Sequence, residues 1–157
     1  MAQKISTALL TAAAAAFTLG AQADTPAQWQ ALTSNLQVTM EQAITKATET
    51  VPGKVYEIEL DDGDGAGVRY EAQILTPAGD SVEVWVNAAS GQASQHENDG
   101  KAKRKDVKRA QEAQIDIMHA VQAATVHTPG KAVKAELDSH WGKTTYQIDV
   151  LQADHTV

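Results

Sequence analysis

The side chains best suited to chemistry in this sequence are three clustered aspartates, Asp61, Asp62 and Asp64. Clustered carboxylate oxygens are the ligands that Ca²⁺ prefers in proteins. The spacing does not follow the EF-hand pattern, and the matching stretch later in the chain, residues 138–142, lacks the second and third acids. We therefore expect residues 61–67 to form a solvated turn between two strands, with metal binding as the weaker alternative.

No histidine or serine stands in a pattern typical of catalysis. His96 and Glu97, with Asp99, form the one loose metal-ligand cluster, and it lies in an exposed polar stretch. The chain has no cysteine, which excludes a thiol nucleophile, and it contains no HExxH helix, P-loop or nucleophile elbow. The sequence thus predicts a protein that is not an enzyme and has no catalytic residue, cofactor site or metal site.

Residues 1–23 are typical of a secretory signal peptide. Lys4 precedes an apolar run over residues 5–20, and small residues then lead to a cleavage site between Ala23 and Asp24. A membrane anchor is the alternative, but the run is about 16 residues long and a spanning helix needs roughly 20. We expect an exported protein of the periplasm or the medium.

Composition narrows the range of partners. The formal net charge is −7, and this acid excess argues against nucleic-acid binding, which needs a basic surface. No later segment is apolar and long enough to cross a membrane once the signal is removed. Without cysteines, a small unit must hold by packing alone, so we expect two units packed together or a homodimer.

A duplication organises the rest of the chain. The tripeptide Pro-Gly-Lys at 52–54 returns at 129–131, and residues 37–61 share 10 of 25 positions with residues 114–138. Likeness at a fixed offset is the signature of repeated structural units. We define residues 38–92 as the first module and residues 114–157 as the second module.

The first module predicts one helix and three strands, after a lead-in helix within residues 24–37. Thr39 provides a cap for the main helix, whose apolar stripe is Met40, Ala43, Ile44, Ala47 and Val51. Pro52 ends that helix. Alternating side chains then predict an antiparallel meander with one wet face, in which Tyr56, Ile58 and Leu60 face the helix.

Residues 93–113 read as a polar and basic linker that leads into a helix. Its cations could mark an anionic partner, but a solvated linker is the stronger interpretation; they are Lys101, Lys103, Arg104, Lys105, Lys108 and Arg109. The second module repeats the helix and two strands and lacks the last strand. A truncated chain, a strand from a partner or a weakly folded module would each account for this.

Trp85 is the one aromatic side chain expected on the wet face of the meander. It can be an exposed anchor for a protein partner. Alternatively, the lead-in helix covers it through Trp29 or Leu32. The sequence leaves these two interpretations open.

With these residues in place, the chain resembles the PepSY family. The resemblance rests on the Ala-rich helix, the Val51–Val55 junction, the acidic strand and loop, Tyr70-Glu71, and the closing run Val84–Asn87 with Gly91 just after. It implies two tandem α-β-β-β, cystatin-like modules in an α+β fold, and a non-catalytic role.

The function that the resemblance implies is that of an exported interaction module. Such a module would inhibit or modulate a secreted or periplasmic peptidase, or bind another envelope protein. The alternative is an envelope sensor or a ligand-binding or metal-binding module.

Overall fold

The structure, a computed structural model, describes residues 25–154 and 157. The α-helices are α1 (Pro26–Thr33), α2 (Met40–Thr50), α3 (Arg104–Glu112) and α4 (Ile117–His127). The strands are β1 (Lys54–Asp61), β2 (Arg69–Leu75), β3 (Asp80–Asn87), β4 (Ala93–Lys101), β5 (Lys131–His140) and β6 (Lys143–Leu151). A short 3-10 helix, η1 (Gly63–Gly65), connects β1 to β2. This α+β architecture with two tandem modules confirms the expected fold class.

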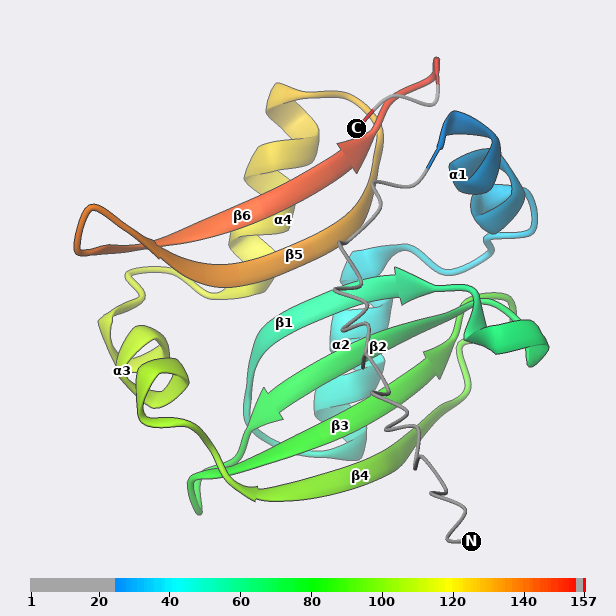
Figure 1. Ribbon diagram of the computed structural model, residues 1–157. Helices are drawn as coiled ribbons and strands as arrows, with labels where there is room; N and C mark the ends of the chain where they lie inside the picture. Colours follow the sequence, from blue (N-terminus) through cyan, green and yellow to red (C-terminus); the bar gives the residue numbers. More distant parts are fainter. Residues whose placement is uncertain (1–24, 155–156) are drawn as a thin grey trace, which may run out of the picture.

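The two modules share one sheet. All six strands are antiparallel in the order β4-β3-β2-β1-β5-β6, so β1 of the first module pairs with β5 of the second (Figure 1). Ile58 lies opposite Ala135, its own counterpart in the repeat, while Glu57 faces Glu136 and Glu59 faces Lys134. This register relates the modules by an approximate two-fold axis through Ile58 and Ala135.

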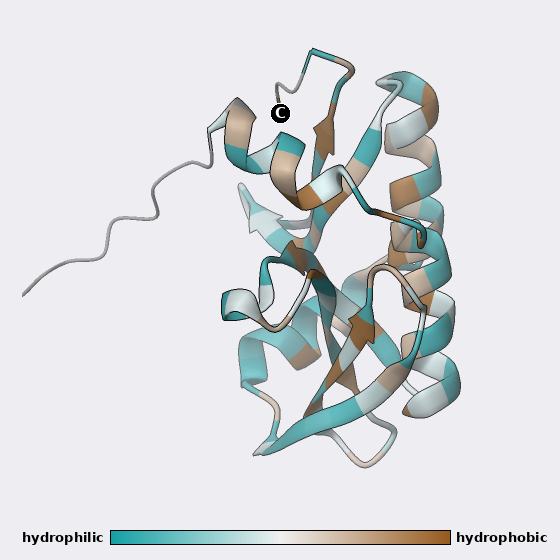
Figure 2. Cartoon of the chain, turned by 90° about the vertical axis from the view of Figure 1, so that its right-hand side faces the viewer, coloured by the Kyte–Doolittle hydropathy of each residue, from teal (hydrophilic) through white to brown (hydrophobic). Residues whose placement is uncertain are grey.

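Helices α2 and α4 cover one face of the sheet (Figure 2). Thr39 caps α2 with a reciprocal Gln42 bond, and Asp116 accepts from the His119 N–H at the start of α4. The stripe of α2 is buried against the strands, and one contiguous apolar cluster runs from Val38 to Leu151 through both modules. The protein therefore has one core rather than two.

The repeated glycines of the Pro-Gly-Lys motif are required by space. A Cβ on Gly53 would lie 2.5 Å from the Leu75 carbonyl oxygen at the end of β2. A Cβ on Gly130 would meet the Leu151 carbonyl oxygen at the end of β6 in the same way. In both modules the chain leaves the helix so close to the neighbouring strand that only glycine fits.

A β-bulge occurs at the same place in both modules, and it corrects one expectation. The pairing of β1 with β2 skips Tyr56, and the pairing of β5 with β6 skips Val133. The extra residue breaks the alternation, so Tyr56 does not join Ile58 and Leu60 on the helix side. Its hydroxyl instead bonds to Ser81 on the opposite side of the sheet.

The expected linker over residues 93–113 is wrong in its first half, where residues 93–101 form the edge strand β4. Most side chains of β4 are polar and exposed, so the strand lacks the apolar alternation that would have indicated it. The second half forms α3, which lies before α4 as α1 lies before α2. The lead-in helix is thus part of the duplicated unit.

Candidate interaction surface

We call the side of the sheet that α2 and α4 leave uncovered the open face. Helices α1 and α3 lie beside opposite ends of the β1–β5 pair (Figure 1). Most side chains on the open face are polar, unlike the apolar side chains of a buried sheet face. They include Glu57, Glu59, Arg69, Glu71, Gln73, Ser81, Glu83, Lys134 and Glu136.

Trp85 lies on the open face, held between two side chains. The His96 ring stacks on it with centroids 3.4 Å apart and planes 12° from parallel. The Arg69 guanidinium carbon lies 3.8 Å from the Trp85 ring centroid, which is cation–π distance. The indole N–H donates to Glu83. The ring is half-buried by these neighbours on strands β2, β3 and β4, and Trp29 and Leu32 pack on the core cluster instead.

Bulges bring two residues of β4 onto the open face. In the β3–β4 pairing the residues without a partner are His96 and Asp99. His96 covers Trp85, and Asp99 Oδ2 lies 3.5 Å from Ser81 Oγ. Bulges therefore direct three side chains of this surface, Tyr56, His96 and Asp99. Bulges commonly change the direction of side chains at functional sites.

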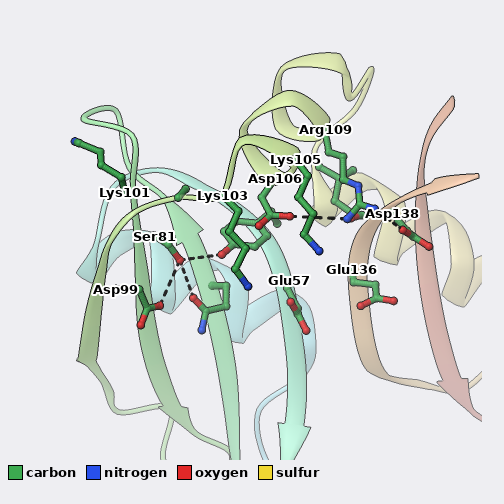
Figure 3. Close-up of a pocket in the computed structure, with 14 residues that line it drawn as sticks. Glu57, Ser81, Asp99, Lys101, Lys103, Lys105, Asp106, Arg109, Glu136 and Asp138 are labelled. Atoms are coloured by element: carbon green, nitrogen blue, oxygen red, sulfur yellow. Dashed lines mark hydrogen bonds and ion pairs between the residues drawn. The ribbon is translucent and has the colours of Figure 1, made fainter. Parts of the chain in front are cut away.

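A hollow of about 640 Å³ lies between α3 and the sheet (Figure 3). Glu57 and Glu136 rise from its floor, and Lys103 and Lys105 reach over it from the α3 side. At its wall, Arg109 donates to Asp138 Oδ1 at 2.9 Å. The hollow is polar and mixes both charges, unlike the mostly apolar pockets that hold small molecules.

The centre of the open face holds three acids around one lysine. Lys134 Nζ lies 3.5 Å from Glu59 and 3.6 Å from Glu136. Burial lowers the pKa of Lys134, but the attraction of Glu59, Glu136 and Glu57 outweighs it and the net shift is upward. Burial also raises the pKa of Glu57, against the opposing effect of Lys134. The acid excess at this point attracts cationic groups.

Ser81 is the most enclosed hydroxyl of the surface, but its contacts are structural. Its Oγ lies 2.8 Å from the Tyr56 hydroxyl and donates to the Gln73 side-chain oxygen at 3.1 Å. Asp99 is its third neighbour. None of these partners is a histidine that could activate a nucleophile.

The acidic turn is built by its own aspartates. Asp61 Oδ1 accepts from the Gly63 N–H at 2.7 Å and pairs with Arg69 at 3.2 Å, while Asp62 accepts from the Asp64 N–H. Between residues 25 and 154, no group of three histidine or acidic side chains lies close enough together to hold a metal ion. The proposed cleavage site, Ala23 and Asp24, lies outside the described residues.

One exposed aromatic residue was missed by sequence reasoning. Trp141 is 90% exposed at the tip of the β5–β6 hairpin, with a φ of +52°. A bulky residue in this left-handed region is unusual and strained. The signal was present in the sequence, because Trp-Gly stands where a two-residue hairpin prefers Asn-Gly.

The sequence profile of the PepSY family, described as "Peptidase propeptide and YPEB domain", matches residues 37–93 and 115–157. The two matches cover well over half of the chain and coincide with the two modules. The chain therefore belongs to the PepSY family, whose domains are commonly associated with peptidase propeptide or inhibitor roles and are generally non-catalytic.

No curated protein and no solved structure matches the chain significantly. Among the described helices, none combines the length and apolar character needed to cross a bilayer.

Proposed function

We propose that this protein is an exported, non-catalytic module that binds a peptidase of the cell envelope and restrains it through the open face. Family membership supports the class of partner, because PepSY domains are associated with peptidase propeptides and inhibitors. The proposed export rests on residues 1–23, with cleavage between Ala23 and Asp24. Amino-terminal sequencing of the protein recovered from a periplasmic fraction tests this point, and a start other than Asp24 contradicts it.

The observation that carries the proposed binding surface is the arrangement around Trp85. Binding hot spots are enriched in tryptophan and arginine. Here Arg69 and Trp85 are already in contact, and Glu83 and His96 fix the indole further. A ring held in this way loses little side-chain entropy when a partner covers it.

The charges of the open face support a partner segment of mixed polarity. Glu57, Glu59 and Glu136 lie at its centre, whereas Lys103 and Lys105 lie at the α3 side. Charges of opposite sign on the floor and on the α3 side of one hollow fix the orientation of a partner and speed its association more than they add affinity. A protein surface with basic groups opposite the centre and acidic groups opposite α3 fits this pattern.

The decisive experiment measures complex formation and peptidase activity with a panel of purified envelope peptidases. We expect at least one peptidase to bind and lose activity, and Trp85→Ala to weaken that complex roughly thirtyfold, as removal of a hot-spot tryptophan does. Thermal unfolding of the variant checks that the half-buried ring is not needed for folding itself.

Val126→Ala is the matched control. Val126 is 83% exposed on α4, in the layer behind the sheet, so its loss removes apolar surface far from the open face. If both variants weakened the complex equally, the peptidase would not bind through the open face. Absence of any complex across the panel would contradict the proposed function.

A further inference from the structure

The two edges of the sheet differ in how they are protected. Strand β4 carries two bulges, at His96 and Asp99, and its side chains are mostly exposed and polar. Bulges and charges are the usual devices that prevent an edge strand from pairing with another chain. At the other edge, the extra residue of the β5–β6 pairing, Val133, lies in β5, so β6 itself runs without a bulge.

Comparison with the first module shows which contacts in the second module are left uncovered beside β6. Tyr70 on β2 and Tyr146 on β6 are counterparts, and each donates its hydroxyl to the backbone before the main helix, at Val38 and Ile115. In the first module the turn between β3 and β4 covers this contact: the Val38 N–H donates to the Ala88 carbonyl oxygen, and Val38 is only 9% exposed. In the second module Ile115 is 50% exposed.

The uncovered surface continues as a groove between α4 and β6. It has a volume of about 510 Å³ and is lined mainly by small or apolar groups, among them Ala120, Ala124, Tyr146 and Ile148. The counterparts of the two alanines, Ala43 and Ala47, are fully buried in the first module. The groove is therefore an apolar site that one further strand would fill.

We infer that β6 pairs antiparallel with β6 of a second copy of this chain, in a register centred on Tyr146. This register places Lys143 of each copy opposite Asp149 of the other, so that two opposite-charge pairs form on the open side. On the helix side, Thr144 lies opposite the second copy's Ile148, and the two Tyr146 residues face each other. In this register, β6 of the second copy provides an opposite charge for Lys143 and for Asp149, and it also places side chains next to the apolar groove.

The helix layer has room for this pairing. Helix α4 packs equally on β5 and β6, so it lies above the boundary between them. Two such boundaries would be separated by two strand spacings, about 9.6 Å. Packed helices lie about 8–10 Å apart, and α4 carries small residues, Ala120 and Ala124, on this side. The β1–β5 junction already joins two edges by the same antiparallel, two-fold arrangement.

The test begins with sedimentation of the purified protein over a range of micromolar concentrations, where we expect a monomer–dimer equilibrium. Each single reversal, Lys143→Asp or Asp149→Lys, turns two attractive pairs into two repulsive ones and should raise the dimer Kd roughly tenfold or more. The double reversal restores the pairs and should restore the Kd. Lys143 is exposed, whereas Asp149 is half-buried and lies opposite Lys134 of its own chain, so Lys143→Asp is the cleaner single reversal. Thermal unfolding confirms that each variant is folded.

Cysteine variants test the register directly, because the native chain contains no cysteine. Residue 146 alone faces its own copy, so Tyr146→Cys should give a disulfide-linked dimer under mild oxidation. Gln147→Cys should not, because paired residues then stand two positions apart, beyond the about 7 Å Cα separation that a disulfide tolerates.

A monomer at every concentration, or crosslinking through Gln147→Cys rather than Tyr146→Cys, would overturn the inference. So would a double reversal that dissociates as readily as the single ones. Self-association is measured with the protein alone, whereas the proposed peptidase binding is measured with the peptidase present and through Trp85, so failure of one proposal is distinguishable from failure of the other.

Discussion

The ammonium group of Lys54 lies 2.7 Å from the carbonyl oxygen of Ala110, in the last turn of α3. The counterpart contact, from Lys131 to the carbonyl oxygen of Thr33 at the end of α1, measures 3.5 Å. Each lysine of the Pro-Gly-Lys motif thus reaches across to the lead-in helix of the other module. In the Pro-Gly-Lys motif, the proline ends the helix, the glycine allows two backbones to approach closely, and the lysine forms a contact between the modules.

Replacing Lys54 by methionine should lower the free energy of unfolding by about 1 kcal/mol, because a charged donor at a helix carboxyl end is lost. Lys131→Met should cost less, since its contact is longer. Urea unfolding measures both. Lys46→Met, on the outer side of α2 where Lys46 meets only Glu49, is the control. An equal loss in all three variants would mean that the cross-module contact contributes nothing.

Gly53→Ala and Gly130→Ala should each destabilise the protein by roughly 2–4 kcal/mol, since the added methyl would overlap a backbone carbonyl that cannot move freely. Gly65→Ala is the control, because Gly65 has a φ of +87° and open space around its Cα. It should cost only about 1 kcal/mol, from conformational strain alone. Gly53 and Gly130 do not have positive φ, so overlap with the carbonyl is the cause expected there. Chemical denaturation measures all three variants, and losses at Gly53 and Gly130 no larger than at Gly65 would show that the neighbouring strand yields to the added methyl.

Glu57→Gln should stabilise the protein at neutral pH and leave it unchanged in acid. Burial raises the pKa of Glu57 above its ordinary value of 4.5, so the folded chain retains a proton that the unfolded chain releases. The resulting stabilisation is complete below pH 4.5 and is lost as the pH rises through the folded pKa. Thermal unfolding at pH 4 and pH 8 measures the difference between variant and wild type.

The control for that comparison is Glu97→Gln on the exposed strand β4. It should change the melting temperature little at either pH. If Glu57→Gln instead lowered stability at pH 8, the attraction of Lys134 would outweigh the cost of burying the carboxylate.

Trp141→Asn should raise the free energy of unfolding by about 1 kcal/mol. The hairpin turn requires positive φ at both residues, 52° at Trp141 and 74° at Gly142, and asparagine adopts this region more readily than tryptophan. Because Trp141 is 90% exposed, its removal loses little packing. A destabilised variant would mean that the edge contact with His140 outweighs the backbone strain.

The modules and their helices were predictable from sequence because their signals are local. A capping threonine, an apolar stripe and a proline stop define α2 without reference to the rest of the chain. The repeat then extended the same prediction to α4. The family resemblance drawn from these residues is confirmed by the match to both modules.

The open face was much harder to predict, because bulges direct three of its side chains. Tyr56 appeared to alternate with Ile58, and nothing in the sequence marks the extra residue. His96 and Asp99 lie in a strand with almost no apolar side chains, so the strand itself was not recognised. Trp85 was placed on the correct face, but its contacts with Arg69 and His96 depend on pairing between β2, β3 and β4.

The sequence also did not predict that the two modules share one sheet. Pairing of β1 with β5 depends on edges that are distant in the chain, and the pattern of each strand is the same whether or not its edge is filled.

This shared sheet also restricts how the gene could have changed after its duplication. Neither copy could be deleted or replaced without the other. Without the first copy, β5 would lose its partner β1, and without the second copy, β1 would lose its partner β5; in both cases the common core would be exposed to water. Divergence is tolerated in the hairpin turns, where the second copy keeps Asp138 at the position of Asp61, lacks counterparts of Asp62 and Asp64, and holds Trp141 at its tip. At the Ile58–Ala135 contact, any substitution in one copy must fit the other, so the two halves are inherited as a matched pair.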